Sequence, residues 1–219
     1  MPSEASPVWP VVWLVRHGET AWNTEGRMQG HTDSPLTEHG LIQVEALAGR
    51  LRETPPARIV ASDLFRAFQT AAVVARRCNL PLYSDPRFRE QDLGSWSGRT
   101  FPDVELTDPE LARRFRARDP DTRPPNGETR AELAIRVWSA FESHAAAGAP
   151  GPFLIVSHGG AIQTLIYRVL GLPLTTVRRF RLPNVGLTTL VHRGGAWFVQ
   201  TLNDTSHLSS TSPEHFPFE

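Results

Sequence analysis

The stretch VVWLVRHGET at residues 11–20 contains the clearest structural signal in this chain. Five apolar residues come first, and the run then ends in Arg16, His17 and Gly18. A short apolar run bounded by glycine is typical of a buried strand that carries its polar residues to the carboxyl edge of a sheet, where ligands of open α/β sheets bind. There an arginine can clamp an anion and an imidazole can act as a nucleophile. For these two residues alone, an ordinary surface pair at a strand end is the simpler alternative.

A second stretch, FLIVSHGG at residues 153–160, repeats this pattern. Again a short apolar run passes directly into a histidine followed by glycine. Two buried strands that both end in this way bring two imidazoles to one edge of a sheet. We therefore expect His17 and His158 to lie together.

The rest of the chain alternates short apolar runs with amphipathic segments. The predicted helices and strands, after residues 11–16, are a helix from about 37 to 53 capped by Thr37, a strand at 58–61, a helix from about 64, a strand at 82–84, a helix from 129, a strand at 153–156, a helix at 161–170 and a hairpin of 188–192 with 197–202. This alternation predicts a three-layer α/β/α sandwich with a mostly parallel central sheet. We expect a single domain over 1–219, with a small helical cap insertion at about 95–127 and a mobile tail at about 204–219.

Composition restricts the class of partner. The chain has 23 basic and 23 acidic residues, so its formal net charge is zero and gives no support for nucleic acid or an anionic membrane as a partner. All the basic residues are arginines, and Cys78 is the one cysteine, which excludes an internal disulfide. The first residues do not resemble a signal peptide, and no run reaches the ~20 apolar residues of a membrane span. We expect a cytoplasmic protein.

Two further candidates follow the second and third strands. Arg66 lies in the first turn of the helix that Ser62 or Asp63 is predicted to cap, where a positive charge opposes the helix dipole unless an anion shares the site. Glu90 is a carboxylate flanked by arginines in the loop after the third strand, a position suited to proton transfer. A solvated surface arginine and a solvated loop glutamate are the alternatives for these two residues.

These residues together resemble the histidine phosphatase (phosphoglycerate mutase-like) superfamily in their order and spacing. The matching segments are RHGET at 16–20 with Asn23, SDLFRAFQT at 62–70, Glu90, and SHGG at 157–160. The similarity extends from about Val11 to Asn203. The motif Arg-His-Gly alone is a weak signal, whereas the ordered set is a specific one.

The resemblance implies a division of roles within the site. His17 takes the phosphoryl group, and Glu90 donates a proton to the leaving group. The phosphate pocket then consists of Arg16, Asn23, Arg66, His158 and Gly159. Phosphoryl transfer depends on positioning and charge stabilisation, which two guanidiniums and an imidazole can supply, so neither a metal nor another cofactor is expected.

The choice within the family depends on the segment after Glu90. QDLGSWSG at 91–98 resembles the Gly-x-Trp-x-Gly pattern of the phosphatase branch, although that branch commonly has Glu where this chain has Ser97. Phosphoglycerate mutases carry a longer Lys- and Arg-rich segment there. We therefore expect a phosphomonoesterase acting on small phosphorylated metabolites, as a monomer or homodimer. The alternatives are a cofactor-dependent phosphoglycerate mutase and an inactive relative that binds phosphorylated ligands. The presence of every catalytic residue argues against the inactive relative.

Overall fold

A computed structural model describes residues 10–147 and 151–208, and within them six strands form one sheet in the order β3-β2-β4-β1-β5-β6. The strands are β1 Val11–Arg16, β2 Arg58–Ala61, β3 Leu82–Ser84, β4 Phe153–Ser157, β5 Leu187–Arg193 and β6 Ala196–Asp204. The first four strands run parallel to one another, while β5 and β6 are antiparallel to their neighbours. The predicted mostly parallel sheet and its terminal hairpin are confirmed.

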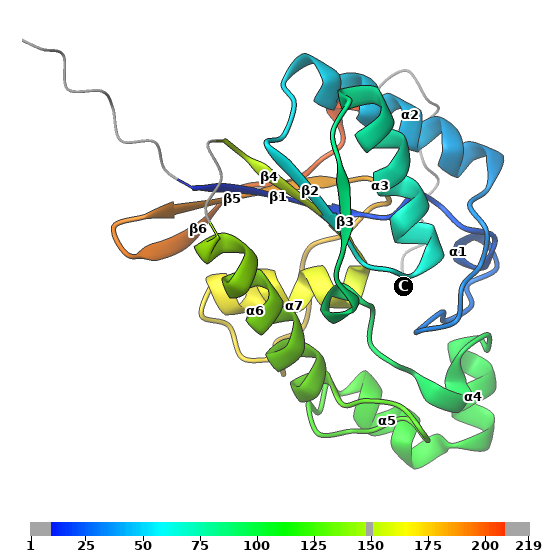
Figure 1. The fold of residues 1–219 in the computed structure, drawn as a ribbon. Helices are drawn as coiled ribbons and strands as arrows, with labels where there is room; N and C mark the ends of the chain where they lie inside the picture. The colour runs from blue at the N-terminus through cyan, green and yellow to red at the C-terminus, as the bar shows by residue number, and fades with distance from the viewer. Residues whose placement is uncertain (1–9, 148–150, 209–219) are drawn as a thin grey trace, which may run out of the picture.

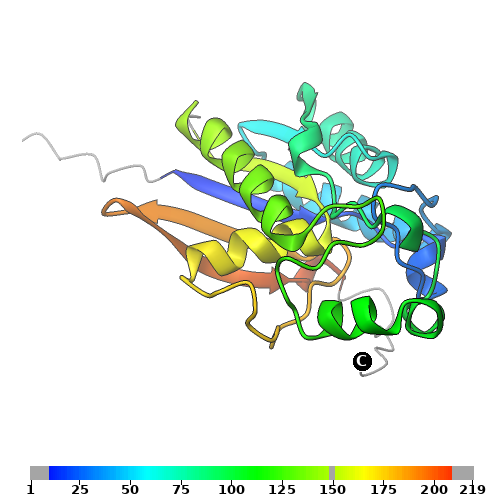
Figure 2. The ribbon, with the colours of Figure 1, turned by 90° about the horizontal axis from the view of Figure 1, so that it is seen from below.

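Helices cover both faces of this sheet (Figure 1). The helices α2 Glu38–Glu53 and α3 Phe65–Cys78 pack on one face, and α6 Arg130–Ala146 and α7 Gly159–Val169 pack on the other. Seen from below, α6 and α7 lie in front of the strands (Figure 2). The three-layer sandwich is therefore confirmed. None of the helices in the described part of the chain is long and apolar enough to cross a membrane.

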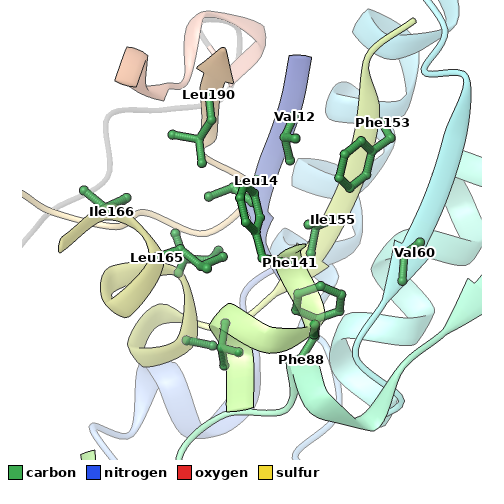
Figure 3. Packing of buried hydrophobic residues seen from close by; sticks show 14 of the residues in the cluster. Val12, Leu14, Val60, Phe88, Phe141, Phe153, Ile155, Leu165, Ile166 and Leu190 are labelled. Atoms are coloured by element: carbon green, nitrogen blue, oxygen red, sulfur yellow. The ribbon is translucent and has the colours of Figure 1, made fainter. Parts of the chain in front are cut away.

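The alternating side chains of β1 hold the two outer layers to the sheet. Val12 and Leu14 point toward α6 and α7, where they pack with Phe141 and Leu165 (Figure 3). Val15 belongs to the core between the sheet and the opposite helices. Complete burial of such a side chain contributes about 1.5–3 kcal/mol. The strand that leads to His17 is thus fixed on both of its faces.

Two short helices lie beyond the carboxyl ends of the parallel strands (Figures 1 and 2). They are α4 Phe101–Thr107 and α5 Pro109–Arg116, and they follow the 3₁₀ turn η2 Gly94–Trp96. Trp96 is fully buried between this turn and the two helices, and its indole N–H donates to Asp108 Oδ2 at 3.1 Å. The segment therefore has a small apolar core of its own, separate from the two cores beside the sheet.

The prediction of a mobile tail from about residue 204 is wrong at its beginning. The strand β6 continues to Asp204, and the 3₁₀ turn η3 Ser206–Leu208 follows it. Arg50 of α2 forms an ion pair with Asp204, and Leu208 is buried in the core beside α2. The Ser- and Thr-rich composition of this segment gave no indication that one apolar residue, Leu208, packs into the core. The remainder of the predicted tail, 209–219, lies outside the described residues.

Candidate active site

The register of β1 and β4 brings the two predicted histidines together. Arg16 is paired with Ser157 across the parallel strands, so His17 and His158 leave the sheet at the same level. The N–H of His17 donates to the carbonyl of Ser157 at 3.0 Å. The centroids of the two imidazole rings are 5.3 Å apart, with the ring planes tilted by 56°. The sequence-based expectation of two adjacent imidazoles is confirmed.

His17 is held in its neutral form with one defined tautomer. Its Nδ1 lies 2.7 Å from the carbonyl oxygen of Gly18, which can only accept, so Nδ1 carries the proton and Nε2 keeps its lone pair. Burial, with the nearby Arg16 and Arg66, holds the pKa of His17 well below its usual 6.5, against the opposing effect of the Gly18 hydrogen bond. The side chain is only 3 % exposed. A buried imidazole with a free Nε2 is the form that a nucleophilic histidine requires.

His158 lies behind His17 and has no exposed surface. Its Nε2 is 2.8 Å from Ser62 Oγ, and burial followed by the charge of Arg66 lowers its pKa well below 6.5. Ser62 Oγ accepts from the backbone N–H of Leu64 at 3.3 Å, and its own hydroxyl proton can be given to Nε2. That arrangement places the single N–H proton of the neutral His158 ring on Nδ1. Among the described residues this buried Nδ1 has no hydrogen-bond partner.

Arg66 is oriented by a single loop. Its side chain is 1 % exposed, Nη1 donates to Asp33 Oδ1 at 2.9 Å and to the carbonyl of Thr32 at 3.0 Å, and Nη2 donates to the carbonyl of Gly30 at 2.8 Å. The buried Nε has no acceptor within the described part of the chain. The guanidinium is therefore held by its two terminal nitrogens, and its Nε–H is left to donate to a ligand.

Asp33 also corrects the prediction for the start of α3. The N-cap residue is Leu64, whose side chain cannot cap, and neither Ser62 nor Asp63 takes that role. Instead Asp33 Oδ2 accepts from the N–H of Phe65 at 2.8 Å. The anion expected beside Arg66 is thus a carboxylate of the protein itself.

Arg16 and Asn23 complete the near side of the site. Arg16 Nη1 donates to the carbonyl of Leu182 at 2.7 Å. The side-chain oxygen of Asn23 accepts from the N–H of Thr20 at 3.1 Å and from Asn184 Nδ2 at 3.3 Å, which leaves its amide NH₂ for a ligand. Asn184 Nδ2 also donates to the carbonyl of His17 at 2.8 Å. Sequence reasoning missed Asn184 because it lies in a loop without a recognisable pattern.

Glu90 reaches the site from the loop after β3. Its Oε2 accepts from the N–H of Gly160 at 2.8 Å, and its Oε1 accepts from the N–H of Gln91 at 2.8 Å. A Cβ at Gly160 would lie 2.3 Å from Oε1, so a larger residue at this position would displace the carboxylate of Glu90. Arg136 Nη2 and His31 Nε2 both donate to the carbonyl of Glu90, at 3.1 and 2.9 Å. Neither of these two positioning residues was predicted.

Most of the predicted residues line one cavity of about 460 Å³, whereas His158, which is fully buried beside His17, is not part of its lining. Arg16, His17, Asn23, Arg66, Glu90 and Gly159 all line it. Gly159 is the first residue of α7, where backbone N–H groups have no partner inside the helix. The outer part of the cavity is lined by Trp22, Met28, Phe115, Arg130, Tyr167 and Arg178, among others. In the described ranges no group of three or more His, Cys, Asp or Glu side chains is arranged to hold a metal ion.

Two adjacent imidazoles, two guanidiniums and a carboxyl group are side chains suited to phosphoryl chemistry, and comparison with known proteins gives the family. The profile of the histidine phosphatase superfamily (branch 1) matches residues 12–205. The chain therefore belongs to this superfamily, as a phosphatase or a mutase.

Similar proteins carry different names. The probable phosphoglycerate mutase GpmB of Proteus mirabilis (strain HI4320) is 37 % identical over 203 residues, which cover 90 % of this chain and 94 % of that protein. The solved structure of Bacillus stearothermophilus YhfR has a TM-score of 0.86 and 33 % identity, over 91 % of this chain and 100 % of its own. A mycobacterial glucosyl-3-phosphoglycerate phosphatase has a TM-score of 0.80 and 32 % identity, over 89 % and 99 %.

Proposed function

We propose that this protein is a phosphomonoesterase that hydrolyses small phosphorylated metabolites through a phosphohistidine on His17. The observation that supports this most directly is the neutral, buried imidazole of His17, whose Nδ1 is bound to Gly18 and whose Nε2 is left free. In the first step Nε2 attacks phosphorus, the ester P–O bond breaks, and the leaving oxygen takes a proton from Glu90. In the second step water attacks the phosphohistidine, Glu90 takes the proton of that water, and phosphate leaves.

The surrounding donors stabilise the charge that spreads over the transferring phosphoryl group. Arg66 Nε and His158 Nδ1 are buried polar atoms without a partner among the described residues, and a phosphoryl oxygen would satisfy them. Arg16 and the amide NH₂ of Asn23 line the same cavity. We propose that these four groups, with the N–H of Gly159, hold the phosphoryl group while it passes to His17.

Four arginines that could hold a mutase intermediate do not reach the cavity, and this observation favours hydrolysis over mutase activity. A mutase has to retain a bisphosphorylated intermediate, which needs additional positive charge above the site. Four arginines near the cap could have supplied that charge, but none of them lines the cavity. Each is bound to a carboxylate: Arg87 to Asp85, Arg89 to Asp63, Arg113 to Glu110 and Arg114 to Asp119. The relative named as a glucosyl-3-phosphoglycerate phosphatase agrees with this assignment, whereas the relative named as a probable mutase favours the alternative.

The experiment that tests this choice is an assay of 3-phosphoglycerate with and without 2,3-bisphosphoglycerate. We expect inorganic phosphate to accumulate in both cases, with little 2-phosphoglycerate formed. Fast interconversion of the two phosphoglycerates that depends on the bisphosphate, with little phosphate released, would assign the chain to the mutases. Absence of both reactions, on this and other phosphomonoesters, would support the inactive binding protein.

A further inference from the structure

The outer wall of the cavity contains two arginines that no carboxylate contacts directly in the described part of the chain, although the charges of Asp119 and Glu90 act on one of them, Arg130. Arg130 and Arg178 both line the cavity, and neither has a hydrogen bond or ion pair within the described part of the chain. Other arginines of the same cavity are neutralised: Arg66 is bound to Asp33, and Arg27 to Glu25. An enzyme cavity that holds arginines without a direct carboxylate partner, away from its reacting centre, is suited to an anionic ligand group.

Arg130 occupies an unfavourable place for a cation. It is the first residue of α6, so its charge faces the positive end of the helix dipole. Its guanidinium lies 5.5 Å from the ring centroid of Phe115, and its Nη1 is shielded from solvent without an acceptor among the described residues. Burial, followed by the nearby Arg118, lowers its pKa to about 10, so it still carries its charge at neutral pH. A desolvated cation in this position lacks the partner that an anion would provide.

A third arginine adds to the positive charge behind this wall. Arg118 follows α5 with a φ of 61°, the left-handed conformation that glycine or asparagine usually adopts after a helix. In this conformation its guanidinium reaches Gln163, a cavity residue. With the amide oxygen of Gln163 turned toward its donors, it accepts from Arg118 Nη1 at 2.9 Å and from the Tyr167 hydroxyl at 2.8 Å. The charge of Arg118 lowers the pKa of Arg130, and the charge of Arg178 lowers the pKa of Arg118.

Glu90 connects this wall with the phosphoryl site. Its carboxylate interacts electrostatically with Arg66, which lies beside the two histidines, and also with Arg130. The group that receives the proton from Glu90 is the leaving oxygen, so the remainder of the substrate extends from Glu90 into the outer cavity. Arg130 is close enough to Glu90 for their charges to interact, and Arg178 lines the same cavity.

We propose that Arg130 and Arg178 bind a second anionic group of the substrate, a carboxylate or a second phosphate, while Arg16 and Arg66 hold the phosphoryl group that is transferred. The inference rests on the proposed phosphatase activity and narrows its substrates to small phosphomonoesters with a second negative charge. Guanidiniums bind both kinds of oxyanion through paired N–H donors. Two anchoring points fix the orientation of the ester against His17.

The test uses pairs of compounds that differ only in the second anion. Inhibition constants are measured against p-nitrophenyl phosphate for 3-phosphoglycerate and glycerol 3-phosphate, and for fructose 1,6-bisphosphate and fructose 6-phosphate. We expect the member with the second anion to bind at least tenfold more tightly in one or both pairs. The first pair reports on a carboxylate and the second on a phosphate. Higher salt should reduce the ratio, because the contact is between charges.

Variants of Arg130 and Arg178 test whether these two residues cause the preference for a second anion. Arg130→Gln and Arg178→Gln should each bring the ratio of inhibition constants at least threefold closer to one, and Arg130→Lys should retain part of it. Arg179→Gln is the matched control, because this exposed neighbour does not line the cavity and should keep both the ratio and the turnover of p-nitrophenyl phosphate. Circular dichroism confirms that each variant is folded.

Two outcomes overturn the inference. One is equal inhibition by both members of each pair in the wild type, and the other is a preference that persists unchanged in both Gln variants. A failure of the proposed function looks different, because the wild type would then release no phosphate from p-nitrophenyl phosphate or from any of the four compounds.

Discussion

The floor and the wall of the cavity are built in different ways. The floor, which consists of Arg16, His17, Arg66 and His158, lies at the carboxyl ends of the strands or in the first turn of a helix that follows one. Its histidines and Arg66 are almost completely buried; His17 and Arg66 are bound to backbone carbonyls, and His158 is bound to the hydroxyl of Ser62. The wall comes from the cap, the start of α6 and the loop after α7, and it includes the exposed Arg178.

Under the proposed function, this difference assigns the reaction to the floor and the selectivity to the wall. Groups that act on phosphorus have to be aligned closely, and a sheet edge with fixed register provides that alignment. Groups that choose among substrates can lie on connections, whose sequence and length vary without disturbing the sheet. A change in the floor should therefore affect every substrate alike, whereas a change in the wall should affect the ranking of substrates.

The largest effect is expected for His17→Ala. Without a nucleophile no phosphoenzyme can form, and we expect turnover to fall about 10⁴-fold or more on every substrate. Acid-quench trapping with labelled substrate should give an acid-labile phosphoenzyme in the wild type and none in the variant. His39→Ala is the matched control, since His39 lies in α2 and does not line the cavity. Equal labelling of wild type and His17→Ala would remove His17 from the role of nucleophile.

Glu90→Gln is expected to have the next largest effect, and it separates the two parts of the site. General acid catalysis contributes ~10²–10⁴-fold, so alkyl phosphates with poor leaving groups should lose about that much in the variant. The loss on p-nitrophenyl phosphate should be far smaller, because its leaving group hardly needs a proton. A uniform loss on both kinds of substrate would assign Glu90 to binding or structure, and Asp92 would be the next candidate for the proton donor.

Burial of the two floor histidines should also make the free energy of unfolding depend on pH, which is a smaller effect. The pKa values of His17 and His158 are held well below 6.5 in the folded protein, mainly by burial, whereas in the unfolded chain both imidazoles take up a proton near pH 6.5. The unfolded state therefore binds more protons as the pH falls below 6.5. The free energy of unfolding should decrease by up to about 1.4 kcal/mol per pH unit for each histidine.

Urea titrations between pH 7 and pH 5 measure this slope. Carboxylates with a lowered pKa, such as Asp85 at about 2, lose their stabilising contribution only at more acidic pH, so they do not disturb this window. His207, whose pKa is lowered to about 4, adds to the slope and can be removed with His207→Gln. His158→Asn should reduce the slope further. A stability that stays constant from pH 7 to pH 5 would contradict the buried neutral state of the floor.

The smallest effect is expected from removal of metal ions. Arg16, Arg66 and His158 can supply the positive charge and hydrogen-bond donors that phosphoryl transfer needs, so EDTA should change turnover by less than about twofold. The measurement is phosphate release before and after dialysis against the chelator. Complete loss of activity that Mg²⁺ or Zn²⁺ restores would mean that the reaction needs a metal ion in addition to these side chains.

The residues of the floor could be predicted from the sequence, but the residues that hold them in position could not. Apolar runs ending in Arg-His-Gly and Ser-His-Gly predicted the strand ends, because burial and a sharp break are local signals. Asp33, which caps α3, is 32 residues away from its partner Phe65, and Asn184 is 167 residues away from His17. No periodicity links residues so far apart. The lack of a direct contact between Arg130 and a carboxylate likewise gave no signal, since it depends on how the side chains are arranged in space.

The position of β1 between β4 and β5 has a consequence for how the protein is made. The first strand has to wait for both of its neighbours, the earlier of which begins at Phe153. At about 5–20 residues per second, the ribosome needs roughly 7–30 s to add the intervening ~140 residues. During that time a hydrophobic strand with two open edges is exposed to chaperones and to aggregation. We expect ribosome-bound chains that stop before Phe153 to be digested by protease at β1, and chains that include β5 to be protected there.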